Sequence, residues 1–257
     1  MKAKYILFFM IGTLLSVSLQ AQEETPGIRK AASKGIEFSV KSGFNIGGTA
    51  PVPLPKEIRE IKGYNPSLTL FIEGDITKWF NSRWGIQTGL RLETKGMETR
   101  ARVKNYGMEI SYNGEPPIAG RWTGMVKTKV HNTYLTVPLL AAYGLTSRWK
   151  LQAGAFFSYM TDGDFTGDVY EGYLRTGDPT GNKVTIDGGQ RASYDFSGDL
   201  RRFQWGAQVG AEWLAFRHFM VHANLTWGFN DIFKNNFETI TFAMYPIYLN
   251  IGFGYLF

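Results

Sequence analysis

Three aspartates and two glycines lie close together in the stretch 162–168, which reads Asp-Gly-Asp-Phe-Thr-Gly-Asp. Carboxylate oxygens at this spacing, with glycines that permit tight turns, suit Ca²⁺ coordination. The stretch lacks the full order of the EF-hand loop and its closing glutamate. Two interpretations of Asp162, Asp164 and Asp168 therefore remain, a calcium-binding loop and an acidic loop solvated by water, and the second is favoured.

Nucleophilic catalysis would need a histidine beside a serine or a carboxylate. The three histidines of the sequence, His131, His218 and His222, show no Ser-His-acid order, and cysteine is absent from the sequence. Disulfides, thiolate metal sites and cysteine nucleophiles are thereby excluded. No glycine-rich phosphate loop follows a strand and opens a helix. The sequence predicts a protein that is not an enzyme and has no cofactor.

Cations outnumber acids between residues 95 and 131: Arg100, Arg102, Lys104, Arg121, Lys127 and Lys129 against Glu98, Glu109 and Glu115. Arginine favours charge-assisted pairing with phosphates, such as those of a surface glycolipid. An ordinary soluble loop, or an extended hairpin, explains the composition equally well. The formal charge of the whole chain is only +6, spread along its length, and gives no reason to invoke nucleic acid.

The N-terminal segment has the features of a targeting signal. Lys2 and Lys4 precede an apolar run from Tyr5 to about Leu15, and a stretch of small and polar residues ends at Ala21. This order is typical of a secretory signal peptide. The apolar run is shorter than the ~20 residues of a membrane-spanning helix. We expect residues 1–21 to be a cleaved signal peptide, and residues 22–34 to be a periplasmic lead-in to the folded part.

From residue 35 onward, eight segments alternate apolar with polar or small side chains, which is the pattern of two-faced strands. Each segment is about as long as the ~9–11 residues with which a tilted strand crosses a bilayer. The segments are 36–46, 67–76, 84–93, 134–143, 150–159, 203–213, 219–229 and 245–257.

Three observations indicate that the apolar faces contact lipid. The lumen of an eight-stranded barrel is barely wide enough for side chains and could not hold so many rings. The polar faces are rich in glycine, which leaves room inside a narrow lumen. Aromatic residues gather at the two ends of the strands, as in the girdles of outer-membrane barrels. The connections agree, because short turns alternate with the long segments 47–63, 95–131, 161–201 and 230–244, which are predicted to be extracellular loops.

Charged residues on the polar faces would then point into the lumen. They could form a polar conduit, or an ion-pair network that plugs the barrel. The plug is favoured, because an unpaired charge in a narrow interior is costly. The residues of this predicted lumen network are Glu37, Lys41, Glu73, Asp75, Arg91, Glu93, Lys150 and Glu212.

The last strand has Phe253, Tyr255 and Phe257 on one face. A terminal strand of this kind is predicted to be the signal that the barrel-assembly machinery recognises. In such recognition the strand adds to the edge of a sheet in the partner, and pockets of the partner bind every second side chain. The same residues would also serve simply as lipid-facing side chains. We expect both roles.

Several motifs resemble the PorT-like outer-membrane β-barrel family, which is common in Bacteroidetes. The stretch 134–140, Tyr-Leu-Thr-Val-Pro-Leu-Leu, is similar to a strand motif of that family, as are Thr94-Lys95-Gly96, the stretch 227–232 and the closing strand 249–257. The resemblance spans about 36–257. It implies an outer-membrane location and an eight-stranded barrel, without a shared reaction.

These observations predict an all-β protein of the outer membrane whose residues 35–257 form an eight-stranded antiparallel up-and-down transmembrane β-barrel. The favoured function is non-enzymatic, with segments 95–131 and 161–201 contacting a protein partner or surface glycolipid outside the cell. A narrow channel for ions or small solutes is the first alternative. A component of a protein-secretion apparatus is the second, implied only by the family resemblance.

Overall fold

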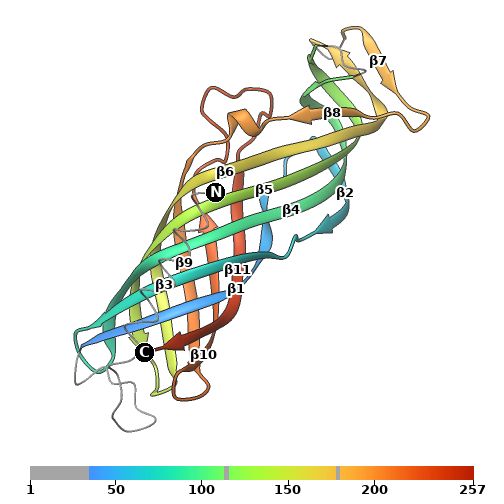
Figure 1. Ribbon diagram of the computed structural model, residues 1–257. Helices are drawn as coiled ribbons and strands as arrows, with labels where there is room; N and C mark the ends of the chain where they lie inside the picture. The colour runs from blue at the N-terminus through green and yellow to red at the C-terminus, as the bar shows by residue number, and fades with distance from the viewer. Residues whose placement is uncertain (1–34, 113–115, 178–179) are drawn as a thin grey trace, which may run out of the picture.

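The computed structural model of the chain describes residues 35–112, 116–177 and 180–257, and it consists almost entirely of antiparallel strands (Figure 1). Within these residues, no helix is long and apolar enough to cross a membrane. The predicted signal peptide and periplasmic lead-in lie outside the described residues. The strands of the barrel are β1 (Ile36–Pro51), β3 (Thr69–Trp79), β4 (Trp84–Ile110), β5 (Ile118–Gly144), β6 (Trp149–Thr176), β9 (Phe203–Leu214), β10 (Phe219–Gly228) and β11 (Met244–Leu256).

These eight strands form a closed ring. Neighbours pair in the order β4-β3-β1-β11-β10-β9-β6-β5, and β4 also pairs with β5, which completes the circle. The first and last strands of the barrel meet at the β1–β11 seam, where Ser39 lies opposite Leu256 and Pro51 opposite Met244. Each strand pairs with its neighbour along the chain, and every pairing is antiparallel. The predicted up-and-down barrel of eight strands is confirmed.

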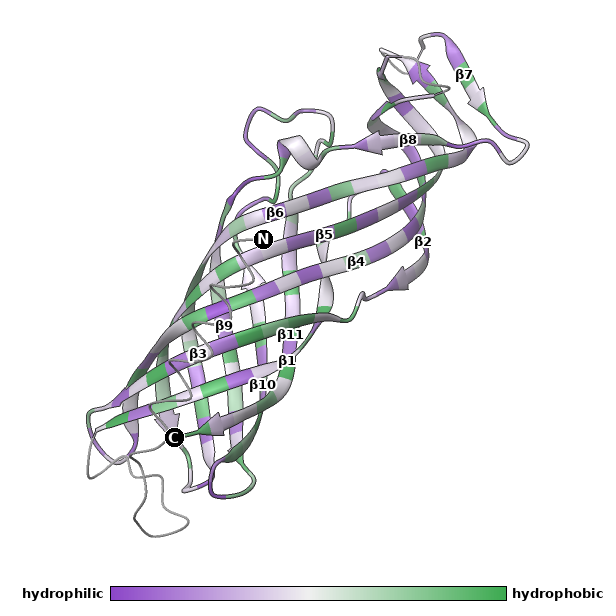
Figure 2. Ribbon diagram, viewed as in Figure 1, coloured by the Kyte–Doolittle hydropathy of each residue, from purple (hydrophilic) through white to green (hydrophobic). Residues whose placement is uncertain are grey.

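The apolar face of the barrel points outward, as predicted. Along β3, Leu70 is 64% exposed, whereas its neighbours Thr69 and Phe71 are buried, and along β11 Phe253 is 57% exposed between buried glycines. Figure 2 shows the resulting alternation of apolar and polar residues along the ribbons. A surface of this kind is stable only in hydrocarbon, so the strands are membrane-spanning.

Three strands continue far beyond the barrel at the end opposite the C-terminus (Figure 1). The outer parts of β4, β5 and β6 pair with β2 (Ile58–Asn65), β7 (Lys183–Ile186) and β8 (Ala192–Asp195), and a short 3-10 helix, η3 (Ser197–Asp199), follows. We call this assembly, residues 58–65, 97–110, 118–131, 161–176, 183–186 and 192–195, the extracellular sheet. The assignment to the outside follows the rule that outer-membrane barrels have short periplasmic turns and longer extracellular connections.

The prediction of long loops at 95–131 and 161–201 is therefore wrong, and for 95–131 the structure shows the extended hairpin that was the alternative. Strand β4 runs to Ile110 and β5 begins at Ile118, while β6 extends to Thr176 and is followed by β7 and β8. The alternation of side chains persists in these parts but with inverted polarity. On β4, outward Leu90 and Leu92 give way to outward Arg100 and Arg102. The outward side meets hydrocarbon at first and water further along, so the same face changes from apolar to charged.

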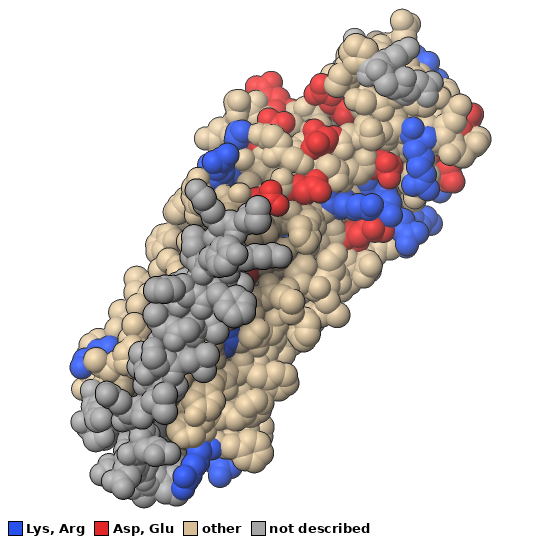
Figure 3. Space-filling view, viewed as in Figure 1, with Lys and Arg blue, Asp and Glu red and all other residues tan. Residues whose placement is uncertain are grey.

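The inner side of the extracellular sheet has a hydrophobic core of its own. Trp122, Val169 and Leu174 are fully buried there, together with Ile186 of β7 and Phe233 of the segment before β11. Phe233 contacts the ring of Phe165 edge-on at 5.0 Å between ring centroids. Charged residues gather on the outside of this sheet, above a largely uncharged barrel wall (Figure 3). The extracellular sheet is thus a folded, water-facing continuation of the barrel.

Candidate functional site

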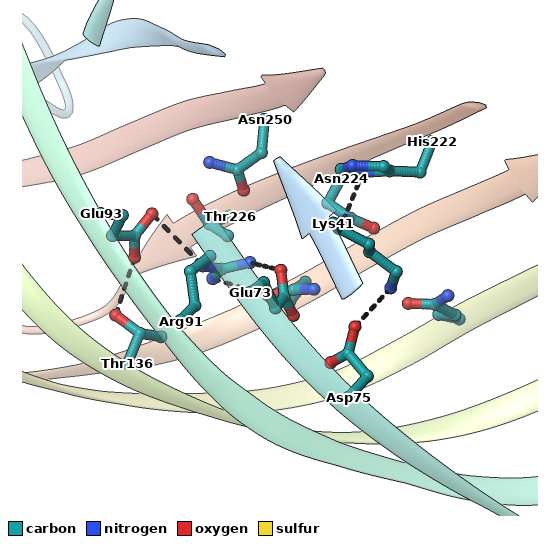
Figure 4. Close-up of polar contacts among 12 residues, drawn as sticks. Lys41, Glu73, Asp75, Arg91, Glu93, Thr136, His222, Asn224, Thr226 and Asn250 are labelled. Carbon is teal, nitrogen blue, oxygen red and sulfur yellow. Dashed lines mark hydrogen bonds and ion pairs between the residues drawn. The ribbon is translucent and has the colours of Figure 1, made fainter. Parts of the chain in front are cut away.

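All eight residues of the predicted lumen network lie on the inner face of the barrel, and seven of them are buried. Alternation along each strand places them inward, and strand pairing brings them to similar heights. They come from β1, β3, β4, β6 and β9. Two ion-pair clusters result, and Figure 4 labels Lys41 and Asp75 of the first and Arg91, Glu73, Glu93 and Thr136 of the second.

The first cluster is centred on Glu212 of β9. Its carboxylate lies 2.5 Å from Nζ of Lys41 and 2.7 Å from Nζ of Lys150, and it also accepts a hydrogen bond from Gln152. Lys41 extends the cluster to Asp75 at 2.7 Å, and Lys150 extends it to Glu37 at 3.1 Å. The cluster therefore crosses the barrel and ties β1, β3, β6 and β9 together.

The second cluster is centred on Arg91 of β4. Its guanidinium lies 3.2 Å from Glu73 and 3.4 Å from Glu93, and Nη2 donates a hydrogen bond of 3.0 Å to Gln208 on the far wall. Glu93 also accepts a 2.7 Å hydrogen bond from Thr136. Both ion pairs are buried, so each carboxylate depends on its cation for solvation.

Lys95 belongs to the same cluster, although it is not among the residues predicted for the lumen network. Its Nζ lies 3.1 Å from Glu93 and within 5.3–5.6 Å of the ring centres of Tyr134, Phe156 and Tyr248. The alternation does indicate this position, because Lys95 continues the inward series of Arg91 and Glu93 at period two, but Lys95 is also the first residue of the predicted loop 95–131. Its contacts bring aromatic bulk to the extracellular end of the lumen.

The histidines do not assemble a catalytic group with a serine in the contacts that the structure shows. His222 points into the lumen, where it contacts the ring of Phe71 edge-on at 5.6 Å and Asn224 at 3.4 Å. His218 lies in a periplasmic turn, with Nδ1 2.7 Å from the carbonyl oxygen of Leu256. His131 is exposed on β5.

Asp162, Asp164 and Asp168 lie along strand β6, not in the loop that the sequence predicted. At ~3.3 Å of rise per residue, the first and last are roughly 20 Å apart, so the three carboxylates do not surround a common point. Asp168 lies 3.7 Å from Arg191, and Asp164 accepts a hydrogen bond of 3.3 Å from Ser197. Throughout the described ranges, no group of three or more histidines and acids could hold a metal ion.

The outer face of the extracellular sheet has a stripe of cations on β4 and β5. It consists of Arg100, Arg102, Lys104, Lys127 and Lys129, and we call it the basic stripe. Strand pairing places Arg100 opposite Lys127, so the two rows lie side by side. Three acids adjoin this group: Glu98 lies opposite Lys129, Glu60 of β2 opposite Arg102, and Asp168 of β6 opposite Lys127. The carboxylate of Glu98 lies 2.9 Å from Lys127, whose hydrogen bond lowers the pKa of Glu98.

Family comparison agrees with the architecture. The model of the outer membrane protein beta-barrel domain family matches residues 20–234, and the chain belongs to that family. This places the protein in the outer membrane. This match does not test the narrower resemblance to the PorT-like family. No curated protein matches the chain significantly.

Solved structures of outer-membrane barrels are similar at low sequence identity. Ail, the attachment invasion locus protein of Yersinia pestis, has 12% identity and a TM-score of 0.34, over 86% of this chain and 97% of that one. Neisserial surface protein A has 11% identity and a TM-score of 0.34, over 86% and 97%. OprG from Pseudomonas aeruginosa has 12% identity and a TM-score of 0.35, over 86% and 95%. These similarities are too distant to indicate function.

Proposed function

We propose that the protein is a non-enzymatic binding protein of the outer membrane, which presents its extracellular sheet to phosphate groups of a surface glycolipid. The observation that supports this proposal is the basic stripe. Arg100, Arg102 and Lys129 are exposed on one face of two paired strands. Glu98 lies opposite Lys129 and Glu60 of β2 lies opposite Arg102, whereas the neighbours of Arg100 across the sheet are Gly63 and Lys127. Arginines in adjacent rows can pair with phosphate oxygens in a bidentate manner.

The filled lumen supports a binding role over the narrow channel. The ion pairs of Glu212 and Arg91 cross the interior, and their side chains are fully buried. Eight strands leave little space beyond such side chains. The contacts among the described residues do not favour the secretion-apparatus alternative, which is supported only by the PorT-like motifs of the sequence.

The test is binding of the full-length protein in phosphatidylcholine vesicles to purified surface glycolipid, with and without its phosphate groups. Replacing Arg100, Arg102 and Lys129 by glutamine should weaken binding to the phosphorylated glycolipid, and raised salt should do the same, because salt screens exposed charges. The matched control replaces three exposed cations of the periplasmic turns, Arg83, Arg148 and Arg217. Equal binding by both triple variants would refute the proposal. Capture of a protein in place of the glycolipid would show that the ligand is a protein.

A further inference from the structure

A cavity of about 370 Å³ lies where the barrel meets the extracellular sheet. Its floor and back are formed by the inner faces of β4 and β5, including Met97, Ala101, Val103 and Val126. The opposite wall is formed by the upper ends of β1 and β11, including Gly48 and Ile247. The volume falls in the range of ~300–1,000 Å³ that is usual for small-molecule sites.

The lining of the cavity is uncharged. None of its residues is Asp, Glu, Lys, Arg or His, and several of its polar groups are already engaged. The hydroxyl of Thr128 lies 2.6 Å from that of Tyr194, and the backbone N–H of Thr49 donates to the sulfur of Met97 at 3.2 Å. An apolar cavity of this kind favours an apolar ligand over water.

The cavity opens at a break in the hydrogen-bonded wall. Strand β1 pairs with β3 only up to Asn45 opposite Thr69, and β2 pairs with β4 alone, so β1 and β2 face each other across an unpaired seam. One hydrogen bond spans this seam, from the hydroxyl of Tyr64 to the carbonyl oxygen of Gly47 at 2.6 Å. Ile61 lines the cavity and is nevertheless 56% exposed, which marks the entrance.

The entrance is continuous with the lipid-facing surface of the barrel. Outward residues of β11 and β1 pair in the order Ile251 with Phe44, Leu249 with Ile46, and Ile247 with Gly48. The last pair lines the cavity. A side chain at position 48 would obstruct it, because a Cβ there would lie 2.8 Å from the sulfur of Met97. A hydrocarbon chain that lies along this surface therefore reaches the cavity without crossing a polar barrier.

We propose that this cavity binds the acyl chain of a lipid from the outer leaflet, which enters sideways through the β1–β2 seam. The lining is apolar, its volume suits part of one chain, and its entrance adjoins hydrocarbon. The site lies on the inner side of the sheet that has the basic stripe on its outer side, so the proposal does not depend on the function proposed above.

The test uses the full-length protein in phosphatidylcholine vesicles that contain a phosphatidylcholine with a diazirine at the end of one acyl chain. After irradiation, peptide mapping should find adducts on the segments 97–103 and 242–247, besides those on the outward faces of the strands. Ala101→Leu fills the cavity and should lower the cavity adducts by about tenfold or more, as an added bulky group does in a closely fitting apolar pocket. Ala223→Leu, on the lipid-facing side of β10, is the matched control and should leave them unchanged.

Folding of each variant is checked by the heat-dependent gel mobility of the barrel. If Ala101→Leu does not fold, competition on the unsubstituted protein decides: unlabelled fatty acid should reduce the cavity adducts and spare those on the outward faces. Adducts confined to the outward faces would overturn the site. Cavity adducts from a diazirine fatty acid supplied in water, with none from the phospholipid, would overturn the membrane lipid as the source.

Discussion

Replacing Arg91 by an uncharged residue is the strongest test of the conclusion that buried ion pairs fill the lumen. The side chain of Arg91 is fully buried and pairs with Glu73 at 3.2 Å and Glu93 at 3.4 Å. In Arg91→Met, Glu93 keeps Lys95, but Glu73 loses its ion-pair partner in the lumen. Breaking a buried pair by removing one partner costs roughly 3–5 kcal/mol, so the free energy of unfolding should fall by about that amount.

The assay is reversible urea unfolding in phosphatidylcholine vesicles, followed by tryptophan fluorescence. Lys62→Met is the matched control, because Lys62 and Glu60 are 2.7 Å apart but exposed, and such a pair contributes ~0–1 kcal/mol. The double variant Arg91→Met with Glu73→Gln should recover part of the loss, since neither charge is then left alone. If Arg91→Met costs no more than the control, the lumen charges are solvated and the plug does not exist.

Three further predictions follow from the same structure. Purified protein in planar bilayers should show no discrete conductance steps, because ion pairs cross the lumen; regular steps would show an open path. Phe257 donates its backbone N–H to Phe38 at 3.0 Å at the closing seam, and its deletion should lower the amount of protein in the outer-membrane fraction on immunoblots; an unchanged amount would contradict its role as an assembly signal. Burial raises the pKa of Tyr194 in the extracellular sheet. The buried, protonated Tyr194 therefore stabilises the sheet fully below the ordinary tyrosine pKa of ~10, and this stabilisation is lost as the pH rises above ~10. In an alkaline absorbance titration, ionisation of every tyrosine of the folded protein near pH 10, with the sheet intact, would refute this.

The membrane part of the fold could be predicted from the sequence because one physical rule governs it. Hydrocarbon outside and a narrow lumen inside impose the same alternation on all eight strands, as in β3 and β11. The inward direction of Arg91 and Glu212 follows from that rule alone. Their partners do not, because the pairing of Lys41 with Glu212 depends on which strands meet across the lumen.

The extracellular sheet could not be predicted in this way. Beyond Gly96 the strand continues, but apolar residues such as Ala101 and Val103 point inward and charged ones point outward. A prediction that expects the apolar side chains to stay on one face interprets this inversion as the end of the strand. The same error placed Lys95 in a loop and the three aspartates of β6 in a calcium-binding candidate. The seam between β1 and β2 depends on long-range pairing, which a local pattern does not show.

The most direct test of the account is a spin-label scan along β4 from Leu90 to Lys104. The sequence has no cysteine, so each position can carry a single cysteine without interference. In vesicles, labels at positions 90 and 92 should be accessible to oxygen, which dissolves in lipid, and labels at 100, 102 and 104 to a water-soluble nickel chelate. Labels at 97, 101 and 103 should be shielded from the chelate. Access of the chelate to positions 90 and 92 would contradict the claim that the outward face of the barrel lies in lipid and that of the extracellular sheet in water.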